Sequence, residues 1–147
     1  MRLFVDTWGW LALEDRNEAS HQPAARIYRE RRRFRGSIVT SDFVLDETIT
    51  RLFRHKPFDE SSRFLDGILR SAAAGVIAIE LVSEARFNGA LALRGRFRDK
   101  PRISFTDLTT MVILRELKCT DVLSADAHFL QVGLGFRILP WSEGSHG

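Results

Sequence analysis

The sequence has few of the features that mark secreted, membrane-bound or disulfide-linked proteins. It contains one cysteine, Cys119, so an internal disulfide is excluded and a reducing environment is favoured. Its longest uncharged apolar run, residues 71–79, is too short to cross a bilayer. The N-terminal apolar segment reaches an acid at Asp6, which is too early for a secretory signal peptide. We therefore expect a cytoplasmic protein that has no membrane segment.

Linkers, internal repeats and low-complexity tracts are absent from the sequence as well. Hydrophobic residues make up 44% of the chain and charged residues 28%, which is typical of a folded protein rather than a disordered one. A chain of 147 residues is long enough to bury a core within one domain. We expect a single domain over residues 1–141 and a flexible C-terminal tail over residues 142–147.

Short apolar segments alternate with longer amphipathic segments along the chain. The short segments predict strands at residues 2–5, 37–39, 76–79, 121–124 and 136–139. The longer segments predict helices at residues 8–13, 18–34, 41–54, 59–74, 83–94 and 105–117. Because strands alternate with helices, we expect an α/β fold in which a central parallel sheet of four to five strands is covered on both faces.

Four acidic residues, spread over the whole chain, stand beside apolar sequence: Asp6, Glu47, Asp107 and Asp126. Apolar surroundings raise the free energy of a charged carboxylate, so each of these residues needs a compensating partner. Asp6 and Asp126 follow predicted strands and Asp107 begins a predicted helix, which places them beyond the carboxyl ends of the strands. Two carboxylates about 5 Å apart repel by roughly 3 kcal/mol at an effective dielectric constant of about 20. We therefore predict that the four acids bind a cation.

The chemistry of these ligands predicts which cation and which reaction. Carboxylates without an accompanying cluster of histidines or cysteines favour Mg²⁺ or Mn²⁺ over Zn²⁺. Such an ion lowers the pKa of a water and neutralises charge on a phosphate, and phosphodiester hydrolysis uses both effects. Setting the four acids aside leaves 15 of the 19 acidic residues against 22 basic ones, which suits a polyanionic substrate. We interpret His128, two residues after Asp126, as a surface histidine.

Each of the four acids also has a purely structural interpretation. Asp6 could cap the helix that follows it, and Asp126 could cap a turn at residues 127–129. Asp107 could close a capping box, although one residue can cap a helix and bind a metal at the same time. Glu47 could pair with Arg51, one helical turn later. The sequence leaves these alternatives open.

Four segments carry a family resemblance when they are taken together. They are Phe4-Val5-Asp6-Thr7, Asp42-Phe43-Val44-Leu45-Asp46-Glu47-Thr48, Ser104-Phe105-Thr106-Asp107 and Leu123-Ser124-Ala125-Asp126-Ala127-His128-Phe129. In this order they resemble the PIN-domain ribonucleases, most closely the VapC-type toxins of toxin–antitoxin pairs, over nearly the whole chain. The resemblance implies an α/β/α sandwich and cleavage of RNA that depends on Mg²⁺ or Mn²⁺. It also implies a homodimer that is silenced by a cognate antitoxin protein.

The resemblance assigns roles to individual residues. It implies a catalytic metal site of four carboxylates, the first three bound directly and the last more weakly or through water: Asp6, Glu47, Asp107 and Asp126. Thr7 and Ser124 match small hydroxyl positions that are suited to orienting the first aspartate. The chain departs from the family pattern at Trp8, which stands where a small residue is more usual.

Basic and aromatic residues suggest where RNA would bind. Five cations alternate at a period of two: Arg94, Arg96, Arg98, Lys100 and Arg102. In an extended loop they would project mostly to one side near Asp107, and we predict that they contact RNA phosphates; a solvated run of charge is the alternative. The arginine-rich run at residues 29–35 is interpreted as a solvent-exposed helix face, with contact to RNA or to an acidic partner as the alternative. Trp8 could stack a base beside Asp6, whereas Trp10 is expected in the core.

Two other functions remain open from the sequence. The same fold could serve as a weakly active or inactive RNA- or protein-binding module, in which case neutralising Asp6 would leave its function intact. A phosphatase of the haloacid dehalogenase type is disfavoured because it would need an aspartate at the position of Trp8.

Overall fold

The computed structural model of the chain describes residues 1–141, so the flexible tail expected at residues 142–147 lies outside the described residues. The strands found there are β1 (Leu3–Val5), β2 (Ile38–Ser41), β3 (Ile77–Glu80), β4 (Asp121–Leu123) and β5 (Arg137–Leu139). They form one sheet in the order β3-β2-β1-β4-β5, and every neighbouring pair is parallel. The α/β fold with a central parallel sheet is confirmed, with five strands.

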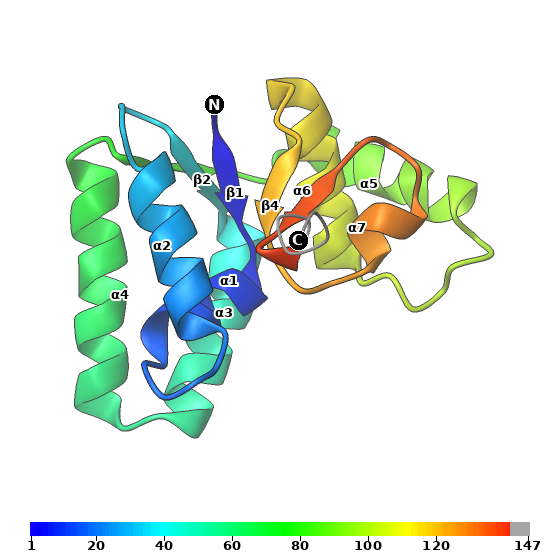
Figure 1. The fold of residues 1–147 in the computed structure, drawn as a ribbon. Coiled ribbons are helices and arrows are strands. Elements are labelled where there is room, and N and C mark those ends of the chain that lie inside the picture. The colour runs from blue at the N-terminus through cyan, green and yellow to red at the C-terminus, as the bar shows by residue number, and fades with distance from the viewer. Residues whose placement is uncertain (142–147) are drawn as a thin grey trace.

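Helices connect the strands and cover the sheet. Those of residues 1–141 are α1 (Thr7–Glu14), α2 (His21–Arg31), α3 (Asp42–His55), α4 (Phe58–Ala73), α5 (Glu84–Arg96), α6 (Phe105–Leu117) and α7 (His128–Gln131). Figure 1 shows α2 and α4 on one side of the strands and α5 and α6 on the other, as in an α/β/α sandwich. In this part of the chain no helix is both long and apolar enough to cross a membrane.

Serine side chains explain where three of the helices begin. Ser41, Ser83 and Ser104 have extended backbones, and each side chain accepts a hydrogen bond from a backbone N–H in the first turn that follows. These caps satisfy donors that the helix itself leaves unpaired. The helix predicted at residues 18–34 is shorter in the structure and ends at Arg31. Phe34, the last residue of the predicted helix, is 49% exposed and packs into no core.

The tryptophan expected in the core links α1 to the centre of the sheet. Trp10 is 2% exposed, which confirms the expectation. Its indole N–H donates to the hydroxyl of Thr40 at 3.0 Å, and that hydroxyl donates to the carbonyl of Val5 at 2.9 Å. A buried polar chain of this kind fixes α1 relative to β1 and β2, and with it the residue between Val5 and α1.

The amino end of the sheet is closed by an ion-pair cluster that the sequence did not suggest. Asp121 is 4% exposed and lies 2.7 Å from Arg31, while Arg137 donates to both of its oxygens at 3.0 and 2.9 Å. Burial raises the pKa of Asp121, but the two guanidinium groups outweigh it and hold the pKa below its ordinary value. The interpretation of residues 29–35 as a wholly exposed face is therefore wrong for Arg31, whose side chain is 18% exposed.

The strand order creates a switch point between β1 and β4. The chain runs outward from β1 through β2 to β3, and then returns to the other side of β1 for β4 and β5. Connections leave the two central strands in opposite directions, so a crevice opens beyond their carboxyl ends. A Cβ atom at Gly9 would lie 2.6 Å from the carbonyl oxygen of Leu123, so only glycine lets α1 begin against the end of β4. The candidate site lies at this crevice.

Candidate active site

One pocket at the switch point gathers all four acids that the sequence singled out. Its lining consists of Asp6, Thr7, Trp8, Val44, Glu47, Arg51, Arg102, Ser104, Thr106, Asp107, Ala125, Asp126 and His128. The acids arrive from the ends of β1 and β4 and from helices α3 and α6, which lie far apart in the sequence. The structure therefore brings together residues 6, 47, 107 and 126.

Asp6 occupies the floor of the pocket and is 7% exposed. Its carboxylate accepts the N–H of Gly9 at 2.9 Å, which makes it the N-cap of α1, and it accepts the hydroxyl of Ser124. The same hydroxyl accepts the N–H of Asp126 at 3.0 Å, so Ser124 joins two of the acids. The hydroxyl of Thr7 donates to the carbonyl of Val44 at 3.4 Å, which links α1 to α3 beside the pocket.

Burial makes the charged form of Asp6 unfavourable. Desolvation raises its pKa to about 7, and the negative charges of Asp126 and Glu47 add to the rise, although hydrogen bonds from Ser124 and Gly9 oppose it. The helix-cap interpretation of Asp6 is thus confirmed, because its side chain caps α1. A cap alone does not account for the two further carboxylates that act on it.

Asp107 lies in the first turn of α6, where the side chain of Ser104 accepts its N–H at 3.1 Å. Desolvation, a hydrogen bond shared with the carboxyl of Asp126 and the charges of Asp126, Asp6 and Glu47 raise its pKa to about 9. Asp107 therefore keeps a proton at neutral pH when no cation is present.

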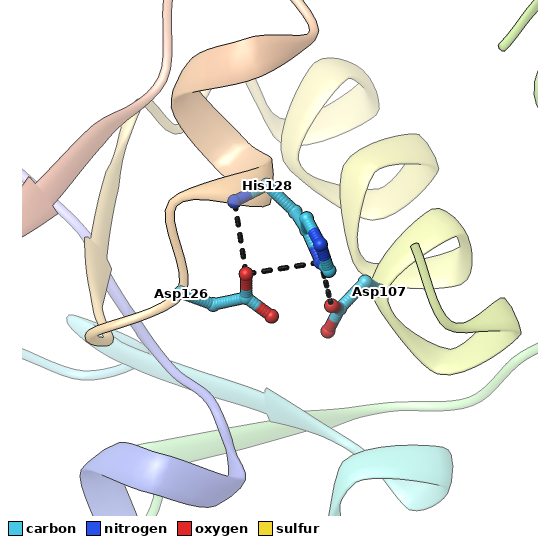
Figure 2. Close-up of side chains that lie close together, drawn as sticks. All are labelled: Asp107, Asp126 and His128. Atoms are coloured by element: carbon cyan, nitrogen blue, oxygen red, sulfur yellow. Dashed lines mark hydrogen bonds and ion pairs between the residues drawn. The ribbon is translucent and has the colours of Figure 1, made fainter. Parts of the chain in front are cut away.

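His128 also points into the pocket, which corrects its interpretation as a surface histidine. Figure 2 shows its ring beside both carboxylates, with Nδ1 at 3.0 Å from Asp126 Oδ1 and 3.7 Å from Asp107 Oδ2. The backbone N–H of His128 donates to Asp126 Oδ1 at 2.9 Å. The histidine follows the acid by two positions, and this spacing was the available signal. The short helix α7, which begins at His128 and turns the ring inward, was not predicted.

Glu47 stands at the edge of the pocket, with 43% of its side chain exposed. It lies 3.7 Å from Arg51 on the next turn of α3, so the ion pair considered from the sequence is present. Both residues line the pocket, and the pair therefore belongs to the site rather than to a remote surface.

The basic stretch does not have the extended conformation that was expected. Arg94 and Arg96 lie in the last turn of α5, and turns follow it as far as Arg102. The guanidinium of Arg94 donates to the carbonyls of Phe97, Lys100 and Ile103 at 2.6 to 2.8 Å. Carbonyls after a helix end need donors, and Arg94 supplies them. Arg102 lines the acidic pocket, and Arg98 donates to the carbonyl of Gly95 at its own turn. The expectation of five cations projecting to one side was wrong because the stretch is not extended: its first two cations lie in α5 and the others in turns.

Two tryptophans flank the pocket. Trp8, in the first turn of α1, lines its wall, and the ring of Trp141 packs edge-on against it with 5.1 Å between the ring centroids. Trp141 is 49% exposed. Large aromatic surface beside a set of carboxylates is suited to holding a planar base.

The donor set fits a divalent cation. Carboxylate oxygens are the ligands that Mg²⁺ and Mn²⁺ take in proteins, and ligand atoms of Asp107, Asp126 and His128 all lie within 4.8 Å of one another. Nδ1 of His128 is buried, and among residues 1–141 no group makes a hydrogen bond of acceptable geometry with it. This unpaired nitrogen beside two carboxylates is a further donor that the site offers to a cation.

The sequence matches no protein-family model and no curated protein. Among solved structures, the fold is similar to VapC20 of Mycobacterium tuberculosis, a toxin that cleaves the sarcin–ricin loop, with a TM-score of 0.75 and 26% identity over 89% of this chain and 95% of that one. It is also similar to PAE2754 from Pyrobaculum aerophilum, with a TM-score of 0.63 over 99% of this chain and 92% of that one. The second likeness, at 13% identity, concerns the fold alone.

Proposed function

We propose that this chain, which belongs to the VapC type of PIN-domain proteins, is a divalent-metal-dependent endoribonuclease that hydrolyses RNA phosphodiester bonds. The observation that carries the proposal is the convergence of four acids from four separate segments in one pocket. The raised pKa values of Asp6, about 7, and Asp107, about 9, mean that the metal-free site holds protons which a cation would replace. Helix capping explains single acids, but it does not explain why all four face the same space.

Residues in and beside the pocket have separate roles in this proposal. Asp6, Glu47, Asp107 and Asp126 would hold Mg²⁺ or Mn²⁺. The ion, when bound, supplies positive charge against the phosphate and makes a water more acidic. Ser124 orients Asp6 through its hydroxyl. Arg51 and Arg102 present guanidinium groups that suit phosphate oxygens, and Trp8 offers a ring on which a base can stack.

The family also guides the choice of substrate and partner. The neighbour from Mycobacterium tuberculosis cleaves the sarcin–ricin loop, so an RNA that contains this loop is the first substrate to try. We propose further that the protein is the toxin of a toxin–antitoxin pair, acts in the cytoplasm as a homodimer and is silenced by a cognate antitoxin.

Cleavage of RNA by the purified chain tests the proposal. Ribosomal RNA and an unrelated structured RNA are incubated with Mn²⁺, with Mg²⁺ or with a chelator, beside Asp6→Asn. The matched control is Asp46→Asn, an exposed acid on α3 that is not part of the pocket lining. We expect cutting that needs metal, is lost in Asp6→Asn and persists in Asp46→Asn. Equal cutting by both variants would contradict the proposal, and RNA binding without cutting would indicate the binding module.

A further inference from the structure

The segment that follows β4 holds His128 against the acidic pocket by short-range bonds. Ser124 accepts the N–H of Asp126 at 3.0 Å, and Asp126 in turn accepts the backbone N–H of His128 at 2.9 Å. The histidine is the first residue of α7, so its backbone is set both by these bonds and by the helix. The ring therefore occupies its place because the local backbone is fixed, and not because a long side chain happens to reach the pocket.

The contacts of the ring do not form ordinary hydrogen bonds. Nδ1 lies 3.0 Å from Asp126 Oδ1 and 3.7 Å from Asp107 Oδ2, yet within residues 1–141 it has no partner of acceptable hydrogen-bond geometry. Leaving a buried polar atom unpaired costs about 1 to 3 kcal/mol. Figure 2 shows the ring facing both carboxylates, so that Nδ1 and the two oxygens lie on one side of the same pocket.

The spacing of these atoms matches that of ligands around one ion. Adjacent ligands of an octahedral ion, with bonds of about 2.1 Å, lie about 3.0 Å apart, and opposite ligands lie about 4.2 Å apart. The 3.0 Å from Nδ1 to Asp126 Oδ1 matches adjacent ligands, and the 3.7 Å to Asp107 Oδ2 lies between the two separations. The side chains of His128, Asp107 and Asp126 are 26%, 16% and 34% exposed, which leaves an open side for water or substrate.

We propose that His128 is a metal ligand, whose Nδ1 joins the carboxylates of Asp107 and Asp126 around the divalent cation. The inference rests on the proposed function, since it concerns the ion of the same site. One nitrogen among oxygen ligands gives the site a preference for a first-row transition ion such as Mn²⁺ over Mg²⁺, which is a hard ion that prefers oxygen. The competing explanation is that His128 only pairs with the two carboxylates, in which case a cation must displace it.

The two explanations predict opposite effects of removing the ring. If His128 binds the ion, His128→Ala weakens Mn²⁺ binding by roughly tenfold or more, and weakens Mg²⁺ binding less. If it only pairs with the carboxylates, the variant binds both ions more tightly. Titration calorimetry with MnCl₂ and MgCl₂ measures both affinities on wild type, His128→Ala and His128→Asn. His55→Ala is the matched control, because His55 is exposed and does not line this pocket.

Pulsed electron paramagnetic resonance of the Mn²⁺-loaded wild type gives a test that needs no variant. A directly bound imidazole nitrogen produces a nitrogen modulation, which we expect in wild type and in His55→Ala but not in His128→Ala. Absence of the modulation in wild type, or tighter Mn²⁺ binding by His128→Ala, would overturn the inference while the nuclease proposal stands. Failure of wild type to bind either ion at millimolar concentration would overturn both.

Discussion

Replacing Asp6 with asparagine should stabilise the metal-free protein while removing its response to metal. A buried acid whose folded pKa is raised contributes stability below its unfolded pKa of 3.8, and that contribution is lost as the pH rises through about 7. At pH 8 the loss for Asp6 amounts to about 4 kcal/mol, because a tenfold change in an ionisation equilibrium corresponds to about 1.4 kcal/mol. Asparagine cannot ionise and so avoids this loss.

The expected gain is smaller than the full electrostatic cost. Asparagine still accepts the N–H of Gly9, but it replaces the carboxylate that accepts the hydroxyl of Ser124, which costs about 1 kcal/mol. We therefore expect Asp6→Asn to be about 3 kcal/mol more stable than wild type at pH 8 in chelator, a rise of roughly 10 °C in melting temperature for a chain of this size. At pH 4 the gain should vanish, because Asp6 is then protonated in the folded protein.

Urea unfolding followed by tryptophan fluorescence measures these differences at pH 4 and pH 8. With chelator present, wild type should lose stability between the two pH values more steeply than the variant, by about 1.4 kcal/mol per pH unit over the range in which Asp6 titrates. Saturating Mn²⁺ should stabilise wild type strongly and Asp6→Asn little. A variant that is no more stable than wild type at pH 8, or equally stabilised by Mn²⁺, would refute the reasoning. Asp46→Asn should behave as wild type in every condition.

Four further substitutions test other parts of the account. Trp8→Ala should raise the KM for RNA roughly tenfold with unchanged Mn²⁺ affinity, because a stacking surface is lost and no ligand is touched; an equal loss of metal affinity in calorimetry would contradict this. Arg94→Ala should lower the free energy of unfolding by about 2 to 3 kcal/mol, whereas Arg102→Ala should change it by less than about 0.5 kcal/mol and weaken RNA binding with a shallower salt dependence. Filter binding over a series of salt concentrations, together with urea unfolding, separates these two effects. Gly9→Ala should destabilise the protein by about 1 to 3 kcal/mol, since its Cβ would lie 2.6 Å from the carbonyl oxygen of Leu123; a melting temperature equal to that of wild type would show that α1 can shift.

The parts of the fold that depend on local sequence were predictable. The buried strands are short apolar runs in the sequence. Ser41 and Ser104 stand at the starts of predicted helices, and the structure confirms both as N-caps. Because parallel strands end at one edge of the sheet, the position of Asp6 after β1 and of Asp126 after β4 was enough to predict that they lie close together.

The parts that depend on contacts between distant segments were not predictable from one sequence. The ring of His128 faces the pocket because Asp126 and α7 orient its backbone, and the sequence carries no periodicity that marks so short a helix. Arg94 was predicted to contact the substrate, but its guanidinium donates to carbonyls in the turns that follow α5. The position of those carbonyls depends on where α5 ends, which the sequence did not show. Arg31 was assigned to solvent because its partner, Asp121, is 90 positions away.

The central claim is that the four acids form a metal-dependent nuclease site, and single-turnover cleavage of one RNA by chelator-treated protein tests it most directly. The RNA contains the sarcin–ricin loop, and the rate is measured before and after Mn²⁺ is restored, for wild type and for Asp107→Asn. We predict no cleavage in chelator, recovery by wild type on addition of Mn²⁺ and no recovery by Asp107→Asn. Cleavage that continues in chelator, or that Asp107→Asn carries out at the wild-type rate, would contradict the claim.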